Sequence, residues 1–151
     1  MPKWTEPKTF WQKFYNIPLI KRLPIEVVAI FCYDRESEEK NFIKDKKLDV
    51  KYIMLTHGHA DHIGDVLELK KLTGAMILAH QDEKEMLNDA NKNMSYELFR
   101  RRIEFEADVY VTDKEKLKVG NHTFTFIATP GHTKGGMCIR IGMDMFTGDT
   151  L

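Results

Sequence analysis

One short stretch of the sequence, THGHADH at residues 56–62, places three imidazoles and a carboxylate close together. Such side chains are costly to desolvate together unless a cation compensates, and imidazole nitrogens and carboxylate oxygens suit zinc, iron or manganese. Side chains alternate along an extended loop, so His57 and His59 can point to the same side and bind one ion. Asp61 and His62 are directed elsewhere and can reach a neighbouring ion. A group of surface or helix-capping residues is the alternative, but this crowding favours a site for two metal ions.

Two later turns each add one candidate ligand. TPGHT at residues 129–133 follows a predicted strand and would project His132 from its end, and FTGDT at residues 146–150 does the same for Asp149. A carboxylate at this second place could bridge two cations. Each turn alone is weak evidence. The order HxHxDH, then a Gly-His turn, then a Gly-Asp turn, each at a strand end, is far less probable by chance, and ligands of layered α/β proteins collect at strand ends.

The elements that must position these residues alternate between strand and helix in the first part of the chain, which predicts an α/β fold. Over residues 50–79 the pattern is a strand–helix–strand unit. Residues 1–24 give no clear pattern. We expect helices at 37–48, 62–72, 82–87 and 96–105, the last carrying a solvated Arg100–Arg102 face, and strands at 25–33, 50–55, 75–79, 109–112, 117–119, 123–128, 137–141 and 145–147.

Composition predicts one soluble globular domain. The 151 residues are 42% hydrophobic and 30% charged, with 23 basic and 23 acidic side chains, so the bulk charge does not favour nucleic acid or an anionic membrane as a partner. Cys32 and Cys138 are far apart and do not suggest a disulfide scaffold. Because no signal peptide and no apolar run of about 20 residues is present, we expect a cytoplasmic protein. A Gly-rich phosphate loop and a GxSxG motif are also absent.

Over residues 48–151 these motifs resemble the metallo-β-lactamase superfamily, and within it the glyoxalase-II-like (hydroxyacylglutathione hydrolase-like) enzymes. The resemblance implies part of an αββα sandwich and two Zn²⁺ ions, with iron or manganese as alternatives. It also implies which side chains bind them: the first ion by His57, His59 and His132, the second by Asp61 and His62, with Asp149 bridging both.

Two departures from the family pattern lead us to expect a truncated member. Residues 29–35 read AIFCYDR where the family has a strand ending in an Asp-Pro-Gly-like turn, so residues 1–45 form a divergent N-terminal segment of the domain. The chain ends at Leu151, whereas the family continues into a C-terminal half that supplies a further histidine to the second metal. An inactive fragment, or one completed by pairing with another chain as a homo-oligomer, is therefore one functional hypothesis.

The leading hypothesis is metal-dependent hydrolysis of a small-molecule thioester through a metal-bound hydroxide, with Asp61 orienting or deprotonating the water. The stretch TPGHTKGG is more similar to the thioesterase-type branch than to the antibiotic-degrading one. An iron persulfide dioxygenase-like enzyme using His57, His59, His132 and Asp149 is the other alternative. For the remaining candidates we favour interpretations without a catalytic role. We expect a structural His80, an exposed His122 and a buried Cys138, and we expect Thr133 and Lys134 to be solvated loop residues that do not bind substrate.

Overall fold

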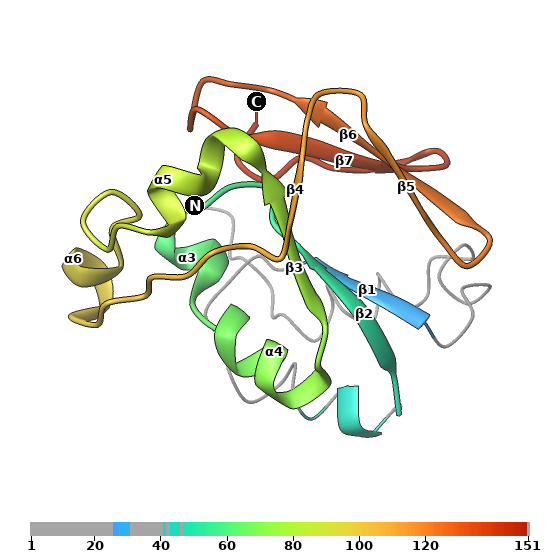
Figure 1. The fold of residues 1–151 in the computed structure, drawn as a ribbon, viewed down its shortest axis with the longest axis horizontal. Coiled ribbons are helices and arrows are strands. Elements are labelled where there is room, and N and C mark those ends of the chain that lie inside the picture. Colours follow the sequence, from blue (N-terminus) through green and yellow to red (C-terminus); the bar gives the residue numbers. More distant parts are fainter. Residues whose placement is uncertain (1–25, 31–40, 42, 46, 151) are drawn as a thin grey trace, which may run out of the picture.

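The structure is a computed structural model of the chain, and it describes residues 26–30, 41, 43–45 and 47–150 (Figure 1). Residues 41 and 43–45 are helical and lie inside the helix expected over 37–48. Apart from residues 26–30, 41 and 43–45, the divergent N-terminal segment lies outside the described residues, and so do Cys32 and the end of the first predicted strand.

In the described part of the chain, the first sheet contains four parallel strands in the order β1-β2-β3-β4: β1 Glu26–Ile30, β2 Asp49–Met54, β3 Met76–His80 and β4 Val109–Val111. The short apolar runs predicted these strands well, although β1 is described only to Ile30. Parallel strands end at a common edge of the sheet. That edge therefore receives the residues that follow β2, among them His57.

Between β2 and β4, where every residue is described, the connections contain five short helices: α3 Ala60–Ile63, α4 Val66–Thr73, the 3-10 helix η2 Gln81–Glu83, α5 Lys84–Leu87 and α6 Ser95–Phe99. The single helix predicted over 62–72 is wrong, because Gly64 and Asp65, both poor helix formers, separate α3 from α4. The helix predicted over 96–105 is also too long. Arg100 has a positive φ of 53° and ends α6, so the arginine trio lies in a loop.

The second sheet, as far as the chain is described, contains four antiparallel strands in sequential order: β5 Lys116–Val119, β6 His122–Ala128, β7 Met137–Ile141 and β8 Asp144–Phe146. Tight turns at Gly120-Asn121 and Gly142-Met143, in which both glycines have a positive φ, join β5 to β6 and β7 to β8. The expectation that His122 is exposed in a turn is wrong. It pairs with Val119 as the first residue of β6 and is half-buried.

Alternating side chains build two cores. On β3, Ile77 and Ala79 face the helices and join a core with Val66 and Leu69 of α4, whereas Leu78 faces the second sheet. The layers are thus helices, parallel sheet and antiparallel sheet (Figure 1). This arrangement confirms the α/β class and the partial αββα sandwich. Within the described part of the chain, no helix is both long enough and apolar enough to cross a membrane.

Candidate metal centre

The loop after β2 carries the first candidate ligands and is fixed at both sheets. The Leu55 N–H donates to the Leu78 carbonyl of β3 at 2.9 Å, and the Thr56 carbonyl accepts from the N–H of Met137 in β7 at 2.9 Å. His57 is consequently buried, with 2% of its surface exposed. His59 caps α3 in extended conformation, and the first turn of that helix presents Asp61 and His62.

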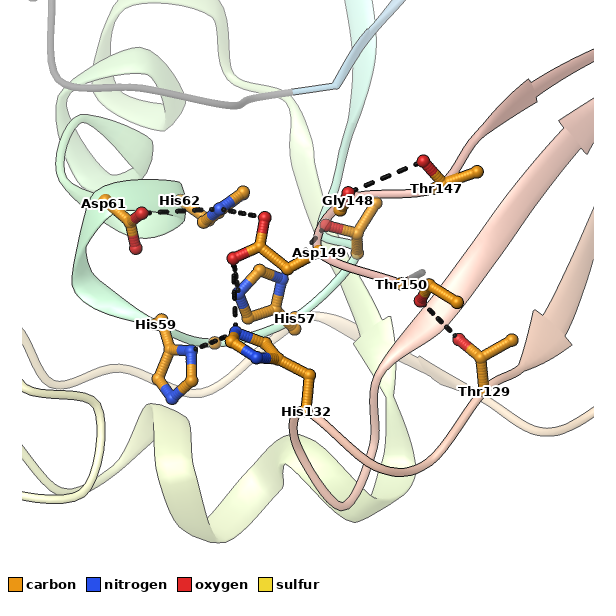
Figure 2. Close-up of polar contacts among 12 residues, drawn as sticks. His57, His59, Asp61, His62, Thr129, His132, Thr147, Gly148, Asp149 and Thr150 are labelled. Atoms are coloured by element: carbon orange, nitrogen blue, oxygen red, sulfur yellow. Dashed lines mark hydrogen bonds and ion pairs between the residues drawn. The ribbon is translucent and has the colours of Figure 1, made fainter. Parts of the chain in front are cut away.

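The four histidines His57, His59, His62 and His132 form one cluster (Figure 2). The ring of His57 lies at its centre, with ring centroids 5.0 Å from His59, 4.0 Å from His62 and 4.9 Å from His132. Nδ1 of His59 and Nε2 of His132 are 2.9 Å apart. Side chains 73 residues apart in the sequence therefore meet at one point.

Asp149 lies between the histidines. A turn from Thr147 to Thr150, closed by the Thr150 N–H on the Thr147 carbonyl at 3.0 Å, projects its carboxylate into the cluster. Oδ2 is 3.2 Å from His132 Nε2 and 3.7 Å from His57 Nε2, whereas Oδ1 is 3.4 Å from His62 Nε2. One carboxylate thus faces two sets of imidazoles with its two oxygens.

Among the described residues, two groups of side chains have the spacing of metal ligands: His57 with His59 and His132, and His57 with Asp61 and His62. In each group the donor atoms lie within 4.8 Å of one another. Asp61 Oδ2 is 3.6 Å from His62 Nε2. His57 belongs to both groups, which the sequence did not indicate. The six candidate ligands are brought to one place, at the common edge of both sheets.

Protonation and hydrogen bonding show that this cluster fits metal ions. Burial, followed by the neighbouring His62, lowers the pKa of His57 to about 3; burial and then His132 also lower the pKa of His59. Neutral imidazoles are the form that binds metal. Among the described residues, Nε2 of His57 and Nδ1 of His62 are buried without a hydrogen-bond partner, a costly state that a cation at His57 Nε2 would relieve.

Other residues fall outside the cluster or were missed. His80 is buried and its Nδ1 accepts from the Asp82 N–H at 3.2 Å, as the structural interpretation predicted. Cys138 is a buried residue of β7, also as predicted. Glu83, in contrast, was missed: its carboxylate accepts from the N–H groups of Gly58 and Gly135 in the two loops that carry ligands. Its position within a run of charged residues gave no signal of this contact.

Comparison with known proteins decides the family. The model of the metallo-β-lactamase superfamily matches residues 33–151. The chain belongs to this superfamily. A hydroxyacylglutathione hydrolase of Pelagibacter ubique (strain HTCC1062) is 32% identical over 127 residues, which cover 81% of this chain and 46% of that protein. A probable polyketide biosynthesis zinc-dependent hydrolase, PksB of Bacillus subtilis (strain 168), is 31% identical over 109 residues, covering 72% of this chain and 42% of the relative.

Solved structures show the same fold. The BLEG-1 B3 metallo-β-lactamase superposes with a TM-score of 0.69 at 26% identity, covering 83% of this chain and 69% of that one. The metallo-β-lactamase SMB-1 gives a TM-score of 0.63 at 30% identity, with 78% and 48% covered. The chain spans about half the length of the curated relatives it matches. The superfamily is one of metal-dependent hydrolases, and the His/Asp cluster fits divalent ions.

Proposed function

We propose that this chain carries the dinuclear zinc centre of a hydrolase for small thioesters of the hydroxyacylglutathione type. The observation that supports it most is the convergence of two ligand groups on either side of the Asp149 carboxylate. The sequence likeness to hydroxyacylglutathione hydrolases favours thioesters over the other ester-like and amide substrates that such a centre could cleave.

The ligands divide between two ions in our proposal. His57, His59 and His132 hold the first ion through nitrogens that already approach one another. Asp61 and His62 would hold the second, and Asp149, whose two oxygens are directed at different histidines, would contribute to both. Imidazole and carboxylate ligands of this kind fit zinc, and a catalytic zinc keeps a position for water or substrate.

Zinc in such a centre supplies Lewis acidity, which brings the pKa of a bound water near neutrality and stabilises negative charge on an acyl oxygen. The chain's own residues do the rest. Asp61, whose side chain is 44% exposed, is the residue that we propose to orient the water and take its proton. His132 and Asp149, each with 43% of the side chain exposed, open the centre to solvent on the side from which a substrate would arrive.

The test is the metal content of purified protein by elemental analysis, for wild type, His59→Ala and the control His122→Ala. His122 is a histidine of β6 outside the ligand groups. We expect about two zinc ions per chain in wild type and the control and a sharp loss in His59→Ala. Hydrolysis of a hydroxyacylglutathione, measured by the appearance of the free thiol, should be lost in parallel.

Other outcomes would contradict the proposal. Iron alone together with oxygen consumption would instead support the persulfide dioxygenase hypothesis. Zinc binding without thioester hydrolysis would support the metal site but refute the proposed activity. If the wild type bound no metal, both parts of the proposal would be refuted.

A further inference from the structure

Glu83 is a fully buried acidic residue that contacts both loops carrying ligands for the first ion. It is 1% exposed and ends the short η2 helix after β3. Its Oε2 accepts from the Gly58 N–H at 2.6 Å, and its Oε1 accepts from the Gly135 N–H at 2.7 Å. Gly58 lies between His57 and His59, and Gly135 follows His132 in the β6–β7 loop. One carboxylate thus joins the two loops, because each of its oxygens accepts one hydrogen bond.

These bonds are of the strong kind. Hydrogen bonds to an ionised acceptor are short and about twice as strong as those between neutral groups. The ion pairs of the described residues do not include Glu83, so its neighbours compensate its charge mainly with backbone N–H groups. A buried negative charge beside a histidine cluster also favours cations there.

The backbone is shaped around this carboxylate. A Cβ atom at residue 135 would lie 2.5 Å from the Glu83 nitrogen and 2.7 Å from its Cγ, and one at residue 58 would lie 3.0 Å from Oε2. A side chain at residue 135 would displace the backbone of Glu83, and one at residue 58 would crowd its carboxylate. Glycines at these two places are therefore part of the same contact, since they let the loops come within hydrogen-bond distance.

We propose that Glu83 is a positioning residue for the metal centre: it holds the loop of His57 and His59 against the loop of His132, so that the ligands of the first ion are aligned before the ion binds. The inference rests on the proposed metal-binding function. Removing one acceptor should lower metal affinity without removing any ligand, by about 10–100-fold, as is typical for residues that orient metal ligands.

The test compares wild type, Glu83→Gln and the control Glu104→Gln. Gln keeps the volume of Glu83 but has one acceptor oxygen in place of two, and Glu104 is a partly exposed residue whose Oε1 accepts from the Ala90 N–H at 3.0 Å, away from the ligand loops. Zinc affinity is measured by competition with a chromophoric chelator. The visible spectrum of the Co²⁺-loaded protein reports ligand geometry. We expect weaker binding and an altered spectrum in Glu83→Gln only.

The outcomes separate the two proposals. If the wild type bound no metal, both the proposed function and this inference would be refuted. Wild-type affinity and spectrum in folded Glu83→Gln would refute the positioning role alone. Unfolding of both Glu83→Gln and Glu83→Asp, with Glu104→Gln folded by circular dichroism, would show a general stability role and would also overturn it.

Discussion

Gly148 is the position where a single added methyl group should damage the metal centre most selectively. Its φ is +52°, a left-handed conformation that costs a residue with a side chain about 1–2 kcal/mol. A Cβ there would also lie 2.4 Å from Oγ1 and 2.7 Å from Cβ of Thr56. Overpacking of this kind costs about 1–3 kcal/mol. We therefore expect Gly148→Ala to lower the free energy of unfolding by about 2–5 kcal/mol.

The metal centre should change as well, because Thr56 cannot retreat easily. Its carbonyl accepts from the Met137 N–H, and the residue itself is buried. The turn of residues 147–150 must therefore move instead, carrying the Asp149 carboxylate away from His132 and His62. Weaker zinc retention in a chelator competition is the expected result, together with the loss of stability measured by urea denaturation.

Gly74→Ala is the matched control. Gly74 also has a positive φ, 72°, but its Cβ would meet nothing within 4 Å, and it ends α4 away from the ligand loops. This variant should lose about 1–2 kcal/mol and bind zinc like the wild type. If Gly148→Ala matches Gly74→Ala in stability and keeps wild-type zinc affinity, the reasoning from the Thr56 contact is refuted.

Three further predictions follow from the same cluster. The folded pKa of His57, about 3, lies below the unfolded value of 6.5, so the metal-free protein should lose stability as the pH falls from about 6 to 4. This residue should contribute a loss of about 1.4 kcal/mol per pH unit. Urea denaturation at several pH values should show that the unfolding free energy depends less steeply on pH in His57→Gln than in wild type, and equal slopes would contradict this. Asp149→Asn should reduce the zinc content from about two ions to about one, since the amide has lost the charge that faces both ligand groups; unchanged content by elemental analysis would exclude a bridging role. Chelation of a metal present at about 1,000 times its Kd should remove about 4 kcal/mol, a fall of about 8–16 °C in Tm by calorimetry; an unchanged Tm would mean that the ions do not stabilise the fold.

The clustering of the candidate ligands could be expected from the sequence because several of them stand shortly after a recognisable strand. His57 follows the apolar run of β2, His132 follows β6, and Asp149 follows β8. Strand ends can be read from hydrophobic runs and turn residues, and such ends meet at common edges. The helix boundaries were less accessible. Arg100 adopts a left-handed conformation without being glycine or asparagine, so nothing local predicted the end of α6.

Glu83 was hidden for a different physical reason. Its partners are backbone N–H groups 25 and 52 residues away, and a backbone donor has no side-chain identity that a sequence can reveal. The role of His57 in both ligand groups was hidden too, because it depends on how α3 turns His62 back to within 4.0 Å of the His57 ring. Sequence therefore predicts which residues take part, whereas long-range packing determines how they are shared and held.

The centre also joins the two sheets, and this links metal binding to folding. His57, His59, Asp61 and His62 come from the parallel sheet and its helix, whereas His132 and Asp149 come from the antiparallel sheet. At the ligand loops, the bond from the Met137 N–H to the Thr56 carbonyl and the bond from the Gly135 N–H to Glu83 already cross between these halves. A cation shared by His57, His132 and Asp149 would add further cross-links at the same edge. Metal binding and sheet packing should therefore stabilise each other, because an ion bound by both halves is lost when they separate.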